Sequence, residues 1–352
     1  MKKSLAIDGL APSYPHEPIY GIAALSRALG VREMRLQRVA QMANGLYRLA
    51  AEETKLDGSK RQTYDAQPLL KAIQKRIKDR ILVRVICPPY LNGSLKGRST
   101  RTNAEPHVGA RILFDEDIAN FFPSIRPEIV KRMWLGLFGF SNDVSTLLTL
   151  LTVKDQGVPQ GAVTSSYLAN FVFWAHEPSL VRRFAAQGLA YTRFVDDISV
   201  SSKAIVAPQA KSLVISEIYG MLSRHGLEPK PAKHKISTHR GRMTTTKLVI
   251  NERVSLPKER RRNLRAAVHK LEQRAAFDQY DESLLKEINS VAVKVGQLRA
   301  YHVAEGTQLK ERLRSIRSRV LSSLQAVEQQ RLPVAACASA AHIESTSPPW
   351  NE

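Results

Sequence analysis

The chain has 352 residues, 43% of them hydrophobic, with 53 Lys and Arg against 32 Asp and Glu and a formal net charge of +21. This composition excludes a disordered chain and indicates a globular protein of two or three subdomains. The excess of positive charge favours a polyanionic partner, either nucleic acid or an anionic membrane surface.

Membrane and secreted classes fit the sequence poorly. No apolar run approaches the ~18–20 residues that span a bilayer, and the apolar run at the N-terminus breaks too early for a signal peptide. The two cysteines, Cys87 and Cys337, can form neither a disulfide framework nor a zinc site with near neighbours. The sequence therefore predicts a cytoplasmic protein with no membrane partner.

The N-terminal part, residues 1–108, is predicted to be mainly helical. Apolar residues recur at three- and four-residue intervals over 17–53, with a helix break at Gly30, and again over 66–87. The polar loop between these segments suits a hairpin that holds positive charge over an anion, although a solvated loop is equally ordinary.

The central part, residues 109–252, mixes strand and helix patterns. A strand over 110–114 leads toward Asp117, and a strand pair is predicted over 233–252. Helices are predicted over 127–138, 142–152, 162–186 and 208–225.

The C-terminal part is basic. Residues 253–330 have a helical pattern rich in Arg and Lys. Residues 331–352 are rich in Ala, Ser and Pro without a period, which predicts a flexible tail.

The stretch Tyr191–Ser201 predicts two short strands joined by a tight turn at Asp196 and Asp197. A hairpin tip facing water is the plain alternative, because Asp tolerates turn geometry. Asp117 follows another predicted strand, and carboxylates converging from neighbouring strands suit hard cations such as Mg²⁺. Two such ions about 4 Å apart promote phosphoryl transfer. Asp197 could be a third ligand or an orienting group, and nuclease and polymerase both remain open.

Two further motifs bear on this choice. Phe121-Phe122 places aromatic rings near Asp117, where a ring can pack against a nucleotide sugar and exclude a 2′-hydroxyl. Such a pair is usually core, and we expect one of the two to be so. Gln160-Gly161 offers an amide side chain and a position where backbone can approach a base or a template strand.

Together these motifs resemble those of the reverse transcriptase family in order and spacing: Asp117-Ile-Ala-Asn-Phe-Phe-Pro-Ser-Ile, Pro159-Gln-Gly-Ala-Val-Thr-Ser and Phe194-Val-Asp-Asp. The chain looks most like the compact bacterial retron-type or defence-associated branch. The resemblance implies an α+β right-hand polymerase. Fingers would occupy 1–108, a palm of antiparallel sheet with packed helices and inserted finger helices 109–252, and a helical thumb 253–330.

The resemblance also implies residue roles. Asp117, Asp196 and Asp197 would bind two Mg²⁺ ions, for which Mn²⁺ can substitute, and Lys233 would protonate the leaving pyrophosphate unless it is simply a solvated lysine. Nucleotide binding is implied for Lys55, Arg61, Phe121, Phe122 (the sugar gate), Gln160 and Gly161. Nucleic-acid backbone contacts are implied for Arg98, Arg260, Arg261, Arg262, Arg265, Lys310, Arg312, Arg314 and Arg317.

The activity implied is that of an RNA-directed DNA polymerase, a nucleotidyltransferase that uses dNTPs. It would copy a structured non-coding RNA, as template and primer, into DNA within a retron that serves antiphage defence, and an effector protein is left open as a further partner. The alternatives are a defence reverse transcriptase with protein-primed or untemplated synthesis, a nucleic-acid-binding scaffold without chemistry, and a two-metal nuclease.

Three positions depart from the family pattern. Phe194 replaces the usual Tyr before the paired aspartates, and Ser166 stands where Pro commonly follows the first Ser of the second motif. Thr245-Thr246-Lys247 matches a stretch in which retrons often carry Val-Thr-Gly. The last departure disfavours a retron but not a polymerase.

Overall fold

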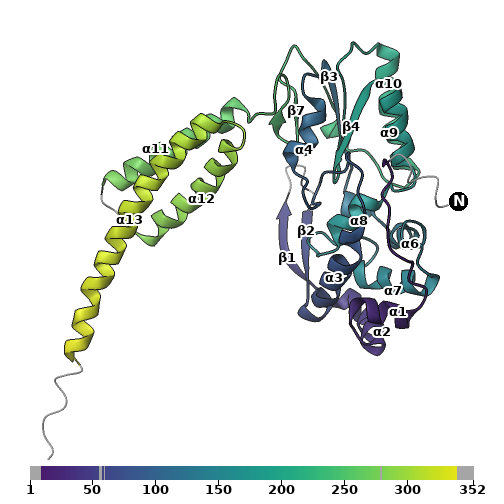
Figure 1. Cartoon of the computed structure of the whole chain (residues 1–352), viewed down its shortest axis with the longest axis horizontal. Helices are drawn as coiled ribbons and strands as arrows, with labels where there is room; N and C mark the ends of the chain where they lie inside the picture. The colour runs from purple at the N-terminus through teal and green to yellow at the C-terminus, as the bar shows by residue number, and fades with distance from the viewer. Residues whose placement is uncertain (1–8, 55–57, 59, 278–279, 339–352) are drawn as a thin grey trace, which may run out of the picture. The chain divides into compact units, whose positions relative to one another are not determined.

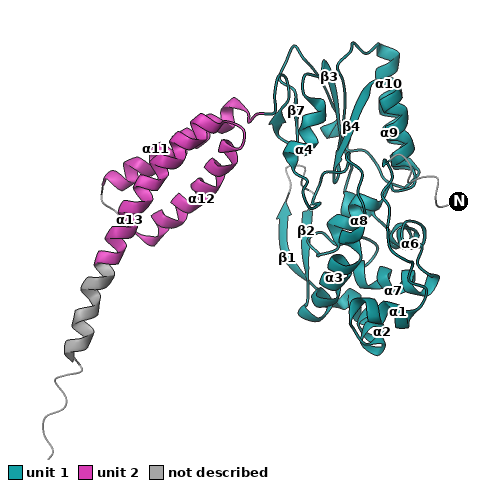
Figure 2. Ribbon diagram, viewed as in Figure 1, with its two compact units in different colours: residues 1–254 teal, residues 255–352 magenta. Residues whose placement is uncertain are grey.

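The chain forms two compact units, Met1–Val254 and Ser255–Glu352, shown in teal and magenta in Figure 2. The computed structural model describes residues 9–54, 58, 60–277 and 280–338, with side chains up to residue 326. The predicted start of the basic helical region, residue 253, lies close to this division.

The N-terminal part of the first unit contains a helical layer and a hairpin (Figure 1). Its elements are α1 (Ile22–Leu29), α2 (Glu33–Met42), η1 (Ala43–Leu46), β1 (Tyr47–Thr54), β2 (Lys60–Ala66), α3 (Pro68–Arg80) and η2 (Leu82–Arg84). Gly30 ends α1 with φ 61° and separates it from α2, as predicted. The prediction of helix up to residue 53 is wrong from Tyr47 onward, because antiparallel pairing of β1 with β2 outweighs the local helix preference of Leu-Ala-Ala-Glu-Glu.

A four-stranded antiparallel sheet forms the centre of the first unit. Its strands lie in the order β4 (Leu189–Phe194), β5 (Asp197–Ser202), β3 (Ile112–Asp117) and β6 (Lys235–Thr238). The strand–turn–strand predicted around Asp196 is the β4–β5 hairpin. The predicted pair over 233–252 consists of β6 and a small separate hairpin of β7 (Thr244–Thr245) and β8 (Leu248–Val249).

The two faces of this sheet differ in polarity, because side chains alternate along each strand. Phe114, Ile198 and Val200 are buried on one face. The helices α9 (Glu177–Ala186) and α10 (Pro208–Ser223) cover that face: Glu177 accepts a hydrogen bond from Tyr191 of β4, and Tyr219 donates one to Glu116 of β3. Aspartate, serine and threonine side chains occupy the opposite face.

The first unit contains further helices, some packed on the sheet and others on the N-terminal helices. They are α4 (Thr100–Ala104), η3 (Glu105–His107), α5 (Phe121–Ser124), α6 (Pro127–Gly136), α7 (Asn142–Thr152), α8 (Ser165–Phe171) and η4 (Pro231–Lys233). The single helix predicted over 162–186 is wrong in one respect: α8 and α9 are separate helices with turns between them. Phe171 and Phe173 are fully buried, as expected from their apolar pattern.

His107 fastens η3 to the polar face of the sheet. Its Nδ1 lies 2.7 Å from the Ser201 hydroxyl and its Nε2 2.7 Å from the Thr192 hydroxyl. Burial disfavours the charged imidazolium and lowers the pKa of His107 to about 4. The neutral ring therefore belongs to the folded state.

This burial predicts an acid-sensitive stability. The folded-state pKa of His107 lies below the unfolded value, so its stabilising effect is full above pH ~6.5 and is lost as the pH falls to about 4. The loss should amount to about 3 kcal/mol at most. We expect His107→Gln to be less stable at pH 7 and to show a shallower fall in melting temperature between pH 6.5 and 4. An equal fall in melting temperature between pH 6.5 and 4 for the two proteins would contradict this account.

The second unit is helical, with α11 (Lys258–Ala276), α12 (Glu282–Arg299) and α13 (Val303–Ala338). Aliphatic side chains from all three helices are buried, among them Leu264, Ile288 and Leu313. Helix α13 continues to Ala338, so the predicted start of a tail at residue 331 is wrong, and the part of that prediction over 339–352 lies outside the described residues.

Candidate active site: a carboxylate-lined cleft

The three aspartates singled out in the sequence meet at one end of the central sheet. The antiparallel register of β3 and β5 sets Asp117 opposite Asp197, and Asp196 lies in the turn that precedes β5. Backbone hydrogen bonds hold this end: the amide of Ile118 donates to the Asp196 carbonyl at 3.2 Å, and the amide of Lys230 donates to the Asp117 carbonyl at 2.7 Å.

The turn between β4 and β5 has a strained backbone. Val195 has φ 62°, in the left-handed region that β-branched residues rarely adopt. A two-residue hairpin turn with positive φ only at its first central position is of type II′, which normally carries Gly there. Strain of this kind costs about 1–3 kcal/mol and persists only where the surroundings impose it.

A cleft of about 590 Å³ opens beside the aspartates. It gathers side chains from segments far apart in the chain: the β1–β2 hairpin, the end of β3, the loop over 154–160, the β4–β5 turn and η4. Seven predicted site residues line it: Arg61, Asp117, Phe121, Phe122, Gln160, Asp196 and Lys233. The fold thus brings most of the predicted nucleotide and metal residues into one cavity.

The carboxylates of the site repel one another. Desolvation and the charge of Asp117 raise the pKa of Asp196. Desolvation, the charge of Asp196 and a hydrogen bond with Asp117 raise the pKa of Asp197 to about 7, even though Asp197 as a whole residue is exposed. Such clustering favours a bound cation that would relieve the repulsion.

Lys233 supplies a positive charge to this cluster. Its ammonium donates to a carboxylate oxygen of Asp117, while 54% of its side chain stays exposed. Partial burial lowers the pKa of Lys233, but the hydrogen bond to Asp117 and the charges of the three aspartates outweigh it and raise the pKa overall. The ion pair shows that Lys233 belongs to the site and is not a lysine facing bulk water alone.

The two phenylalanines after β3 have different environments. Phe121 is 2% exposed and stacks on Phe173, with ring centroids 6.2 Å apart and planes 14° apart. Phe122 is half-buried, and its carbonyl accepts a hydrogen bond from the amide of Val158 at 3.1 Å. Phe121 is therefore largely a core residue, as expected for one of the pair, and Phe122 is the ring available to a ligand in the cleft.

Gln160 and Gly161 join the central sheet region to the β1–β2 hairpin. The Gln160 carbonyl accepts from the Tyr64 amide at 2.7 Å, and its side-chain oxygen accepts from Nε of Arg61 at 3.1 Å. Gly161 has φ 96°, and a Cβ there would lie 2.8 Å from the Tyr64 carbonyl oxygen. Only glycine fits this close approach, so it fixes the position of Gln160 against Arg61.

We expect Gly161→Ala to disturb this junction. The added Cβ has to push the β2 backbone away, which should cost about 1–3 kcal/mol of stability. Displacement of Gln160 and Arg61 should also raise the KM for nucleotide several-fold. Gly220→Ala is the matched control, since its Cβ meets nothing within 4 Å in helix α10. Melting curves and nucleotide titrations of the two variants decide the matter, and a Gly161→Ala protein indistinguishable from wild type would contradict it.

Sequence comparison decides the family. Residues 54–255, which include every lining residue of the cleft except Glu53, match the family described as "Reverse transcriptase (RNA-dependent DNA polymerase)". The chain belongs to the reverse transcriptase family. It is therefore an RNA-directed DNA polymerase with the α+β right-hand architecture of that family.

The curated relatives specify the branch. The chain is 31% identical over 309 residues to the retron Se72 reverse transcriptase of Salmonella heidelberg, covering 87% of this chain and 82% of that protein. It is also 31% identical over 321 residues to the retron Ec48 reverse transcriptase of Escherichia coli, covering 87% and 78%. This reverse transcriptase is thus of the bacterial retron type.

Solved structures give a more distant likeness. A telomerase chain from Candida tropicalis is 11% identical and aligns with a TM-score of 0.36, covering 54% of this chain and 44% of that one.

No helix among the described residues is both long enough and apolar enough to cross a membrane.

Reverse transcriptases use divalent metal ions, and the donor set here fits such an ion. Carboxylate oxygens are the ligands that Mg²⁺ prefers, and desolvation together with repulsion between neighbouring carboxylates raises the pKa of Asp196 and Asp197. Among the described residues, no group of three or more Asp, Glu, His or Cys side chains is arranged to hold a metal ion by itself. Mg²⁺ is commonly held by one or two carboxylates together with substrate phosphates, which suits an ion that binds with the nucleotide.

The predicted backbone-binding cations have mixed environments. In the second unit, Arg261 and Arg265 donate to Glu305, and Arg312 donates two hydrogen bonds to Glu272. Weaker polar contacts join Arg260 to Gln297 at 3.0 Å and Arg317 to Asn289 at 3.2 Å. These contacts join the helices of the unit at its surface.

Three other predicted cations are more available. Arg262, Lys310 and Arg314 are exposed and form no ion pair among the described residues. In the first unit, Arg98 is half-buried near Cys87 and does not line the cleft. Lys55 lies outside the described residues.

The sequence interpretation missed three lysines of the cleft: Lys60, which forms an ion pair with Glu52, and two lysines outside the hairpin. Lys154 and Lys230 both line it, and the Lys154 ammonium lies 4.8 Å from the centre of the Tyr64 ring. Both are close in sequence to residues that were identified, Gln160 and Lys233. A search for cations flanking the motifs could have found them, although nothing in the sequence alone distinguishes them from surface lysines.

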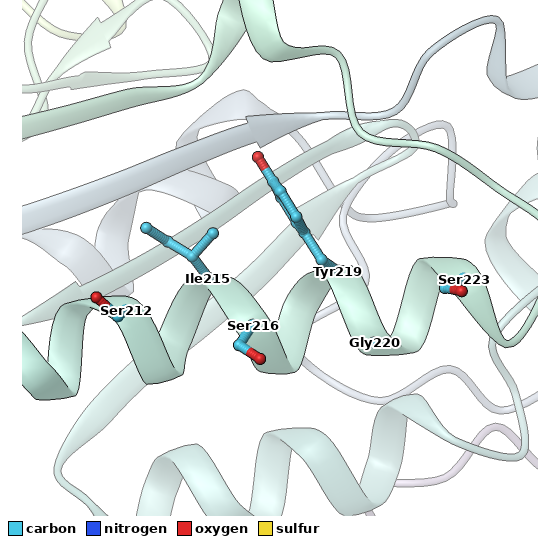
Figure 3. Close-up of a pocket in the computed structure, with 6 residues that line it drawn as sticks. All are labelled: Ser212, Ile215, Ser216, Tyr219, Gly220 and Ser223. Atoms are coloured by element: carbon cyan, nitrogen blue, oxygen red, sulfur yellow. The ribbon is translucent and has the colours of Figure 1, made fainter.

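A second cavity lies along α10, on the other side of the sheet. Ser212, Ser216 and Ser223 lie along the helix, and Tyr219 points from it toward the neighbouring strand (Figure 3). The Tyr219 hydroxyl donates to Glu116 at 3.3 Å, and Nδ1 of His234 lies 2.5 Å from the other Glu116 oxygen. This cavity holds none of the predicted site residues, and its polar contacts fasten β3 and η4 to α10.

Proposed function

We propose that this reverse transcriptase copies a structured non-coding RNA into DNA within a retron that serves antiphage defence, and that the cleft is its polymerase site. The observation that carries the proposal is the convergence of all three family motifs in one cavity: Asp117 with Phe122, Gln160, and Asp196. Arg61 of the β1–β2 hairpin lines the same cavity and supplies a positive charge there. This set suits a nucleoside triphosphate on a metal-assisted polymerase site.

The aspartates would hold two Mg²⁺ ions, with Mn²⁺ able to substitute. Bound there, the ions would activate the attacking 3′ oxygen and stabilise the leaving pyrophosphate. Asp117 and Asp196 line the cleft directly and would be the firmest ligands, while Asp197 would complete the set from its position opposite Asp117. Lys233 lies beside Asp117 with half of its side chain exposed, so its proton can reach a departing pyrophosphate.

The remaining cleft residues would bind the dNTP. Arg61 suits the triphosphate because its guanidinium matches phosphate geometry, and Lys55 would assist it. Phe122 would pack on the sugar and exclude a 2′-hydroxyl. Gln160 and Gly161 would contact the incoming nucleotide and the template from the loop that Gly161 fixes in place.

The larger elements would take the parts of a right hand. Residues 1–108 would form the fingers, 109–252 the palm, and 253–330 the thumb. The exposed cations Arg262, Lys310 and Arg314 would contact the backbone of an RNA–DNA duplex, with Arg98 contributing from the first unit. Such contacts supply affinity without reading sequence, so binding should weaken as salt rises.

The nucleic acid that copurifies with the protein tests this function. The protein would be expressed with its native flanking DNA, and the bound nucleic acid would be digested with DNase or RNase and sequenced, beside an Asp196→Ala/Asp197→Ala control. We expect DNA joined to one discrete RNA in the wild type and RNA alone in the control. DNA without an RNA template would instead indicate untemplated or protein-primed synthesis, and identical RNA in both samples would indicate a binding scaffold.

A further inference from the structure

Arg193 and Glu177 form an ion pair that is fully enclosed beneath the β4–β5 turn, which carries Asp196. Both side chains are 0% exposed. Arg193 donates from Nε to one Glu177 oxygen at 2.6 Å and from Nη2 to the other at 2.8 Å. A buried ion pair of this kind adds little net stability compared with a well-packed apolar pair, because desolvation offsets the attraction. Its presence therefore calls for a role other than stability.

The remaining donors of Arg193 reach the backbone of the site. Nη1 donates to the Val195 carbonyl at 2.9 Å, and Nη2 also donates to the Asn170 carbonyl at 2.8 Å. The guanidinium lies over the Phe173 ring, 5.1 Å from its centre. One side chain thus joins α9, the last turn of α8, and the residue that immediately precedes Asp196.

The same turn is held from a second side by Gly93. A Cβ at position 93 would lie 2.3 Å from Cγ2 of Val195 and 2.6 Å from its backbone nitrogen. Asn170 holds Gly93 there, because its Nδ2 donates to the Gly93 carbonyl at 2.7 Å. The Asn92 amide also donates to the Arg193 carbonyl at 2.9 Å. The strained Val195 is therefore enclosed between Arg193 and Gly93, and Asn170 links the two.

We propose that Arg193 is a positioning residue for catalysis: it holds Val195 in its left-handed conformation so that Asp196 faces the cleft. This role places a charged guanidinium in the core, and Glu177 neutralises its charge. Asn170 and Gly93 complete the support. Arg193 itself lies below the cleft and is not among its lining residues. The inference rests on the proposed metal-binding role of Asp196.

The test compares the effect of losing Arg193 with and without the backbone strain at Val195. Arg193→Lys keeps the charge beside Glu177 but lacks the forked donors that reach Val195 and Asn170. Val195→Gly removes the need for support, because glycine adopts a positive φ without strain. We would measure kcat and the KM for dNTP in primer extension, below the melting temperature of every variant, for each single variant and for the double variant.

We expect Arg193→Lys to lower kcat at least tenfold with little change in the KM for dNTP. In the Val195→Gly background the same substitution should change kcat by less than threefold, since the turn no longer depends on the arginine. An equal loss in both backgrounds would show that Arg193 serves the core alone, and full activity of Arg193→Lys would also overturn the proposal.

Two further variants keep the result interpretable. Should Arg193→Lys not fold, Asn170→Ala weakens the support without touching the ion pair, and we expect a smaller fall in kcat that Val195→Gly again cancels. An undiminished kcat in Asn170→Ala, or a fall in kcat that Val195→Gly does not cancel, would count against the proposal.

Asp196→Asn distinguishes failure of the metal-binding role of Asp196 from failure of the positioning proposal alone. If it stays active, the role of Asp196 and the positioning proposal fail together; if it is inactive while Arg193→Lys matches wild type, only the positioning proposal fails.

Discussion

Asp196→Asn is expected to lower the rate of primer extension by about a thousandfold or more, equivalent to about 4 kcal/mol of transition-state stabilisation. The amide keeps the shape of the carboxylate but removes the charge that would hold a divalent ion in the cleft. Desolvation and the nearby Asp117 disfavour the charged form of Asp196, as its raised pKa indicates. The variant should therefore fold as stably as wild type at neutral pH, or slightly more so.

Two measurements check this expectation on the same protein samples. Primer extension with Mg²⁺ reports the chemistry, and thermal melting without Mg²⁺ reports the fold. Asp143→Asn, an exposed carboxylate on α7, is the matched control and should equal wild type in both. An Asp196→Asn protein that extends primers at the wild-type rate would show that the carboxylate does not take part.

Phe122→Ala is expected to let the enzyme accept ribonucleotides. The half-buried ring lines the cleft close to Asp117, where it would pack on the sugar of an incoming nucleotide. A hydrophobic surface rejects an added hydroxyl by a factor of about 10² at most, so discrimination against rNTPs should fall by up to that factor. The rate with dNTPs should fall less, because the metal-binding carboxylates are untouched.

Competition between dNTPs and rNTPs in primer extension measures this effect as a ratio of kcat/KM values. Phe121→Ala is the informative comparison, since that ring is stacked on Phe173 in the core. Its truncation should cost about 3–5 kcal/mol of stability and leave the ratio unchanged in whatever folded fraction remains. A ratio that shifts in Phe121→Ala but not in Phe122→Ala would show that Phe121, and not Phe122, contacts the sugar.

Local patterns predicted much of the polymerase core. The alternation of residues around Asp196 indicated a hairpin, and the strand predicted over 110–114 is β3, which starts two residues later and continues to Asp117. Gly30 separated two helices because a positive φ ends a helix cleanly. These features depend on residues near one another in the chain, and the sequence records them directly.

Features that depend on distant partners were not predictable in the same way. Residues 47–54 have a helical composition, yet β2 captures them as a strand. The ion pairs of Arg261 and Arg265 with Glu305 were likewise not predictable, because Glu305 lies on another helix. The Arg193–Glu177 pair gave no signal at all, because nothing in the sequence shows that both charges are fully enclosed.

The most direct test of the central claim is extension of a labelled primer on an RNA template by the purified protein with dNTPs and Mg²⁺. We predict a full-length DNA complementary to the RNA, no product after chelation of the metal, and no product from Asp196→Asn. A primer that is shortened instead of extended, or extended equally without any template, would contradict the assignment of the cleft as an RNA-directed DNA polymerase site.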